Sequence, residues 1–185
     1  MKKSVLWMGS ALMLFSASGF AINQDLLGIY IEGNIGYSYI KEKVINSGND
    51  NNDGVGWNVN GGYQFDPNWA VEAGFTQHTD ETFGGGLRPP TGSENHVIDA
   101  VIKGIYPLVN SVHLFAKIGP AWVHHTLNNA GIVTGTHTRV ALYGGVGGDT
   151  ALTRNLLLTV QVNGSSKGGN VPAMILTSVG LRVMV

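Results

Sequence analysis

Charged side chains are scarce in this chain, and five of them stand in segments that are otherwise apolar or small. Within WAVEAGF, for example, a single carboxylate lies among apolar neighbours. Carboxylate, ammonium and guanidinium groups that are withdrawn from water must be paired or remain hydrated. These side chains can therefore form ion pairs if the fold brings their segments together. The five residues are Glu72, Lys103, Lys117, Asp149 and Arg182.

Other residue types that bind ions give weaker signals. His124, His125 and His137 are close enough in sequence to share a metal ion, but no Cys or carboxylate converges on them. The stretch NDNNDG, residues 49–54, resembles the start of a calcium loop, yet Asn60 stands where the bidentate Glu belongs. We therefore predict no metal site and no cofactor.

The elements that position the five charges are predicted by a two-residue period. In DGVGWNVNGGYQFDPNWAVEAGFTQ, residues 53–77, apolar residues alternate with polar residues and glycine on both sides of the turn DPN. A period of two is that of a β-strand with two different faces. The same alternation predicts eight strands, at residues 28–43, 55–65, 69–78, 96–106, 112–124, 138–152, 156–164 and 173–185.

The connections between these segments alternate in length. Residues 66–68, 109–111 and 153–155 are short turns, whereas residues 46–54, 80–95, 126–137 and 165–171 are longer and polar. Short turns at one end and long loops at the other are typical of an outer-membrane β-barrel, whose short turns face the periplasm. Both chain termini would then be periplasmic and all four long loops extracellular.

The N-terminus and the composition fit export to such a membrane. Two lysines, an uncharged apolar segment and small residues at Gly19 and Ala21 predict a signal peptide at residues 1–21, followed by a barrel domain at 22–185. Without Lys2 and Lys3, 9 basic residues remain of 11 against 12 acidic ones, so no basic surplus points to nucleic acid. Charged residues make up only 12% and Cys is absent, which disfavours a soluble exported domain and excludes disulfides.

The charges decide which face of the strands points outward. A soluble lipocalin-like barrel or sandwich would bury the apolar face, but this face carries more apolar area than a narrow lumen can hold. A charge on a lipid-facing position costs about 2–4 kcal/mol near the midplane. We therefore predict an all-β fold, an eight-stranded antiparallel transmembrane up-and-down barrel with its apolar face in lipid and its charges inside.

Three stretches, GYQFDPNWAVEAGF, AVIKGIYPL and LFAKIGPAW, resemble strands of the OmpA-like transmembrane domain and of OmpX-type small outer-membrane barrels. The resemblance implies an interior ion-pair network that blocks or gates the lumen, with Glu72, Lys103 and Lys117 in the matching positions. The acidic and basic partners of the family on two later strands fall on Gly147 and Thr159. Asp149 and Arg182 would have to replace them.

The end of the chain, SVGLRVMV, resembles the signal by which the assembly machinery recognises outer-membrane barrels. Ser178, Gly180 and Val183 match its polar, glycine and apolar positions. Val185 departs from the pattern, because the family usually ends in Phe or Trp.

Catalysis would need a nucleophile, a base and a group that orients the base, and no such set converges in the sequence. Barrels that deacylate lipid A place a His two residues before a Ser on one strand, and none of the six His residues here has that partner. We predict that the chain is not an enzyme.

From this fold and from the length and polarity of the loops, notably DETFGGGLRPPTGSEN, we predict a monomer in the outer membrane of a Gram-negative bacterium that supports membrane integrity and makes adhesive surface contacts through its extracellular loops. The alternative is a narrow, gated, porin-like pore for ions and small solutes. Expected partners are outer-membrane lipid and lipopolysaccharide, the barrel assembly machinery, periplasmic chaperones and an extracellular surface ligand.

Overall fold

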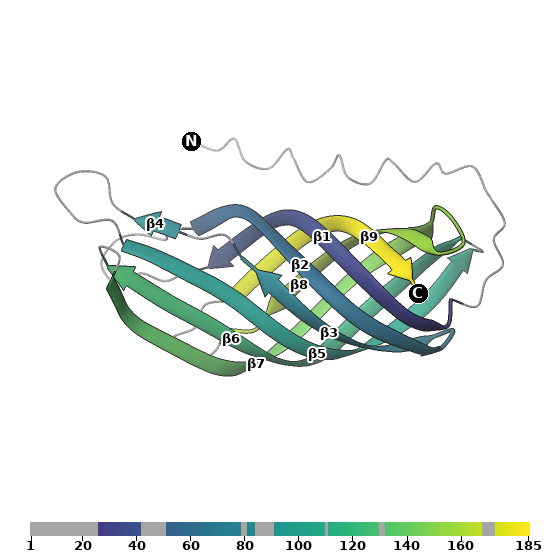
Figure 1. Ribbon diagram of the computed structural model, residues 1–185, viewed down its shortest axis with the longest axis horizontal. Helices are drawn as coiled ribbons and strands as arrows, with labels where there is room; N and C mark the ends of the chain where they lie inside the picture. The colour runs from purple at the N-terminus through teal and green to yellow at the C-terminus, as the bar shows by residue number, and fades with distance from the viewer. Residues whose placement is uncertain are drawn as a thin grey trace.

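The computed structural model describes residues 26–41, 51–78, 81–83, 91–109, 111–129, 132–167 and 173–185. These residues form antiparallel strands that wind around one axis (Figure 1). Among them, no helix is long and apolar enough to cross a membrane. The strands are β1 (Gly28–Lys41), β2 (Asn51–Asp66), β3 (Trp69–Gln77), β4 (Glu81–Phe83), β5 (Thr91–Val109), β6 (Val112–Asn129), β7 (Ile132–Ala151), β8 (Leu156–Ser165) and β9 (Ala173–Met184).

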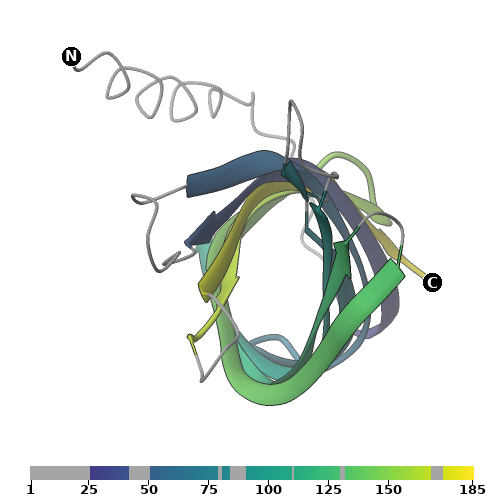
Figure 2. The same cartoon turned by 90° about the vertical axis from the view of Figure 1, so that its left-hand side faces the viewer.

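The barrel has eight strands, because β3 and β4 lie end to end along the same neighbour, β5. His78 continues the ladder past β3 through a 3.0 Å bond from its backbone N to the Asn95 carbonyl. Each strand pairs with its sequence neighbour, and β1 pairs with β9 to close the sheet. Figure 2 looks into this closed ring from the end at which β4 lies. The predicted fold class is confirmed.

The two faces of the strands are oriented as predicted. On β1, Ile31 is 55% exposed on the outside, whereas its neighbour Glu32 is fully buried in the lumen. On β9, Leu181 and Val183 are both 46% exposed, and Arg182 between them is 2% exposed. An exposed apolar surface of this kind is stable only in lipid, and closure leaves no lipid-facing strand edge unpaired.

The strands extend further into the long connections than the sequence predicted. The segment 126–137, predicted as a loop, is largely a hairpin in which β6 and β7 pair as far as Asn129 and Ile132. Likewise, β2 begins at Asn51 and β5 at Thr91, inside two other predicted loops. Beyond the membrane both strand faces meet water, so the two-residue period that identifies strands is lost there although the backbone ladder continues.

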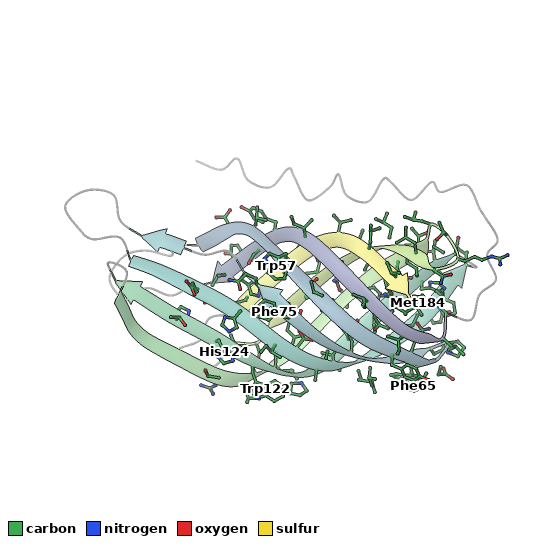
Figure 3. The ribbon with its side chains drawn as sticks, in the orientation of Figure 1. Trp57, Phe65, Phe75, Trp122, His124 and Met184 are labelled. Atoms are coloured by element: carbon green, nitrogen blue, oxygen red, sulfur yellow. The ribbon has the colours of Figure 1, made fainter. Side chains whose placement is uncertain are left out.

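Aromatic side chains mark both ends of the lipid-facing surface. Trp57, Phe75 and Trp122 lie toward the end at which β4 lies, and Phe65 lies toward the opposite end (Figure 3). Trp57 and Phe75 are in contact, with ring centroids 5.6 Å apart. Such belts form where aromatic rings sit at the level of lipid headgroups.

Glycine on the inner face makes room for large side chains that cross the lumen. A Cβ at Gly62 would collide with the ring of Tyr30, and one at Gly147 would lie 2.5 Å from the Phe115 ring. These two rings form the floor of the interior charge cluster described next. The abundance of glycine in the strands is therefore partly a consequence of filling a narrow barrel with long side chains.

Candidate functional site

Six charged residues from six different strands meet inside the barrel, and we call them the interior charge cluster. Five of them were expected from the sequence, and the sixth, Glu32, was not. All are at most 3% exposed. The members are Glu32 (β1), Glu72 (β3), Lys103 (β5), Lys117 (β6), Asp149 (β7) and Arg182 (β9).

Glu72 binds both lysines of the cluster. Lys117 Nζ donates to Oε1 at 2.6 Å, and Lys103 Nζ donates to Oε2 at 3.1 Å. The hydroxyl of Tyr30 donates to the same Oε2 at 3.0 Å. Such charge-assisted bonds are stronger than bonds between neutral groups, and together they offset the cost of burying this carboxylate.

Glu32 is the most connected residue of the cluster. Arg182 Nε donates to its Oε2 at 2.9 Å, and Lys103 Nζ lies 3.6 Å from the same oxygen. Its Oε1 accepts bonds from the side-chain amides of Asn34, Gln161 and Asn60 at 3.0, 3.0 and 3.3 Å. Glu32 therefore links the charges to the polar residues on the extracellular side of the lumen.

Asp149 and Arg182 pair with each other. Arg182 Nη1 lies 2.9 Å from Asp149 Oδ2, an ion pair whose angles fall outside hydrogen-bond geometry. His113 Nδ1 lies 2.8 Å from the other oxygen, Oδ1. Asp149 and Arg182 thus lie in one network with Glu32.

An apolar layer closes the lumen on the periplasmic side of the charges. Lys103 Nζ stands 4.0 Å above the centroid of the Phe115 ring, and the Arg182 guanidinium carbon stands 4.9 Å above that of Tyr30. Cations attract aromatic faces in this geometry. Each residue of the layer occupies an inward position adjacent to the charged level, and the set is Tyr30, Ala70, Ile105, Phe115, Leu157 and Met184.

On the extracellular side the lumen is polar and then apolar again. Asp99, Asn58 and Asn163 are at most 2% exposed and carry side-chain atoms without a hydrogen-bond partner among the described residues. Buried polar atoms of this kind are ordinarily bonded to internal water. A second apolar cluster follows, formed by Ile40, Val97, Val101, Ala121, Val123, Tyr143 and Met174.

The cluster is suited to filling the barrel rather than to a reaction. Three carboxylates face three cations, and each member pairs with at least one opposite charge. An eight-stranded barrel is just wide enough for its own side chains. The arrangement can hold the strands in register and block the passage of solutes.

One Ser–His contact was missed by the sequence argument, which considered spacing within a single strand. Ser38 on β1 lies 2.7 Å from His78 Nδ1, across the lumen. Both residues are at most 2% exposed, and no carboxylate among the described residues is bonded to His78. A buried pair without an orienting acid lacks what a nucleophile needs.

The candidate metal ligands do not converge where they are described. His124 lies on the outer face and contacts Thr138 Oγ1 at 2.8 Å, whereas His125 points inward to Asn95. The side chain of His137 and residues 49–50 of the NDNNDG stretch lie outside the described part. In that described part no group of three or more His, Cys, Asp or Glu residues is placed to hold a metal ion.

The residues of the predicted assembly signal lie on both faces of β9. Ser178 is buried in the lumen, and Gly180 faces inward where β9 meets β1. Val183 faces outward, and Val185, after the end of β9, is 81% exposed.

Sequence and structure comparisons both lead to bacterial outer-membrane barrels. The family model described as "Outer membrane protein beta-barrel domain" matches residues 10–182. Neisserial surface protein A is similar in structure, with a TM-score of 0.71 and 15% identity over 85% of this chain and 97% of that one. The outer membrane protein OprG from Pseudomonas aeruginosa is also similar in structure, with a TM-score of 0.59 and 11% identity over 86% of this chain and 97% of that one. A search of curated proteins finds no match.

A third similar structure is that of Ail, the attachment invasion locus protein of Yersinia pestis, in complex with the heparin analogue sucrose octasulfate. Its TM-score is 0.57, with 16% identity over 84% of this chain and 99% of that one. At these identities the structural likeness supports the fold alone.

Proposed function

The chain belongs to the family of outer membrane protein beta-barrel domains, and on this basis we propose that it is a non-enzymatic barrel that supports membrane integrity and makes adhesive surface contacts at its extracellular end. Its place is the outer membrane of a Gram-negative bacterium, surrounded by lipid and lipopolysaccharide. The observation that carries the proposal is the filled lumen, which leaves the two ends of the barrel and its lipid-facing wall for contacts.

The extracellular end offers a surface that extends well past the membrane. β6 continues from Trp122, in the aromatic belt, to Asn129, and at about 3.3 Å per residue this is roughly 23 Å along the strand. β5 and β7 accompany it and pair with it as far as Thr91 and Ile132. The tips of these strands reach beyond the end of β8 in Figure 1. Together with β4, which pairs with the tip of β5, these strands form a platform that can contact another surface while the barrel remains anchored.

The proposal is tested by shortening this platform. In one variant residues 127–135 are replaced by Asn-Gly, which joins the paired residues Thr126 and Thr136 by a tight hairpin turn. Cells that export the variant should adhere at least about tenfold less to host-cell monolayers and to heparin-coated plates, a loss of about 1.4 kcal/mol or more in surface affinity. Uptake of a hydrophobic dye, which reports membrane integrity, should not change.

The matched control replaces the short turn at residues 153–155 with Gly-Asn-Gly at the opposite end of the barrel. This control and the shortened variant must both migrate as folded barrels on unheated gels. Equal adhesion by the shortened variant and the full chain would refute the adhesive role. Greater dye uptake by cells that lack the protein would support the integrity role, and unchanged uptake would refute it.

A second candidate function, a gated pore, is favoured by the polar atoms of the lumen. Among the described residues, both carboxylate oxygens of Asp99, both amide atoms of Asn163 and Nδ2 of Asn58 have no hydrogen-bond partner, which supports a hydrated chamber above the interior charge cluster. The cluster would then be the gate. In planar bilayers Glu72→Gln should raise the single-channel conductance, because it removes the carboxylate that holds both Lys103 and Lys117. Unchanged conductance would refute gating by these residues.

We also propose how the chain reaches its membrane. Residues 1–21 would be removed as a signal peptide, and periplasmic chaperones would pass residues 22–185 to the assembly machinery as a monomer. The mass of the protein isolated from outer membranes tests the cleavage site, since a mature chain should begin at Ile22.

A further inference from the structure

A groove with two cations at its extracellular end runs down the lipid-facing wall over β6, β7 and β8. Its upper part, of about 490 Å³, is walled by Pro120, Val140 and Leu142. Arg139, Ser166 and Lys167 line the same part. Arg139 and Lys167 are exposed, and the described residues that line this part include no carboxylate.

The groove continues toward the membrane centre along the same strands. A second depression of about 520 Å³ lies over Ile118, Gly144 and Gly164. Each of these residues is two positions nearer the membrane centre than Pro120, Leu142 and Ser166 respectively. Gly144 and Gly164 are register partners on β7 and β8. Two neighbouring glycines therefore leave the outer wall without side chains where lipid chains pack against it.

The cations lie at the depth at which lipid headgroups are expected. Val140, next to Arg139, pairs with Trp122 of the aromatic belt. Ser166 is fixed at the same height, since its backbone N donates to the Leu142 carbonyl at 2.8 Å and its Oγ accepts from the Leu142 N at 3.1 Å. Basic residues at this depth attract anionic headgroups, and an apolar channel below them fits an acyl chain.

We propose that this groove is a binding site for one phosphorylated, acylated glycolipid of the outer leaflet, of the lipid A type. Arg139 and Lys167 bind the phosphate, Ser166 lies beside it, and an acyl chain lies over Gly144 and Gly164. This lipid fits the groove because the cations at the extracellular end match its phosphate and the apolar lower part matches its acyl chain. The proposal does not depend on adhesion or conductance.

The test uses the refolded mature chain in detergent and measures bound diphosphoryl lipid A by native mass spectrometry. Each cation near an anionic lipid contributes about a fivefold gain in affinity, so Arg139→Gln with Lys167→Gln should weaken binding about 25-fold. Dephosphorylated lipid A should bind the unmodified chain about as weakly. The single variant Arg139→Lys keeps a cation in the groove and should bind lipid A nearly as tightly as the unmodified chain. The matched control, Arg154→Gln, removes an exposed cation at the periplasmic turn and should not change binding.

A second variant tests the apolar part. Gly144→Leu places a side chain in the lower groove, where a Cβ meets only the Lys117 carbonyl at 3.2 Å, and it should weaken lipid A binding while the protein still shows the folded gel band. Equal binding by the double variant and the unmodified chain would overturn the proposal. An equal loss in Arg154→Gln would also overturn it, since the attraction would then be unspecific. Displacement of lipid A by millimolar inorganic phosphate would reduce the groove to a phosphate site and overturn the lipid assignment.

Discussion

Glu32 on the first strand of the barrel is bonded to Arg182 on the last, with 2.9 Å between Oε2 and Nε. The two residues are also register partners where β1 pairs with β9. The ion pair therefore spans the seam at which the two ends of the chain meet. Because both side chains are at most 2% exposed, removing either charge leaves the other buried with less compensation.

Replacing Glu32 by Gln should lower the free energy of unfolding by about 3 kcal/mol, the cost of breaking a buried ion pair. Urea titration in lipid vesicles, followed by tryptophan fluorescence, measures this value. The double variant Glu32→Gln with Arg182→Gln should recover part of the loss, because no unpaired guanidinium remains. Arg154→Gln, an exposed substitution, is the control and should change the value by less than about 0.5 kcal/mol. A double variant as unstable as the sum of the single ones would mean that the pair is not coupled.

Gly61 and Gly62 are adjacent in β2 but face lipid and lumen respectively, so they form a matched pair. A Cβ at Gly62 would displace the Tyr30 ring and with it the bond from Tyr30 to Glu72, whereas a Cβ at Gly61 meets nothing within 4 Å. Gly62→Val should destabilise the barrel by about 2 kcal/mol through overpacking. Gly61→Val should be neutral or slightly stabilising in the same urea titration. Equal effects at both positions would contradict the assignment of faces.

The sequence predicted which residues face the lumen, but not which of them meet. A two-residue period assigns each residue to one face of its strand, and this was sufficient to predict that Glu72, Lys103 and Arg182 point into the lumen. Contacts across the lumen depend also on the stagger between strands, which no single strand encodes. Glu32 lies at an inward position of its strand, but the two-residue period alone could not place it at the centre of the interior charge cluster. The Ser38–His78 contact was missed for the same reason.

The three tryptophans of the predicted mature chain should report contact with lipid. Trp57, Trp69 and Trp122 are 43–48% exposed on the outer face. Trp57 and Trp122 lie in one aromatic belt (Figure 3), and Trp69 is the first residue of β3, beside the short turn at the opposite end. Lipids brominated near the headgroup should quench their fluorescence more strongly than lipids brominated near the chain end, since aromatic belts lie at the interface. Quenching of an unheated, folded sample by neither lipid would contradict the orientation of the apolar face.

The last residue offers a test of the proposed assembly signal that leaves the barrel wall intact. Gly180 is unsuitable, because a Cβ there would collide with the Gly33 carbonyl across the seam and prevent closure whatever the machinery recognises. Val185 is 81% exposed, so Val185→Phe supplies the usual terminal aromatic residue without repacking. Pulse-chase labelling should show the folded, heat-modifiable form accumulating about twofold faster in cells, a change of about 0.4 kcal/mol in the assembly barrier.

The same Val185→Phe variant should refold in detergent at the rate of the unmodified chain, because the added ring makes no interior contact. Met184→Phe is the matched control, since Met184 points into the periplasmic apolar layer and a ring there should slow both processes. Faster refolding of Val185→Phe in detergent would mean that the substitution speeds folding of the barrel and not its recognition by the assembly machinery. An unchanged rate in cells would mean that recognition does not depend on the terminal side chain, and that the pattern of Ser178, Gly180 and Val183 is enough for assembly.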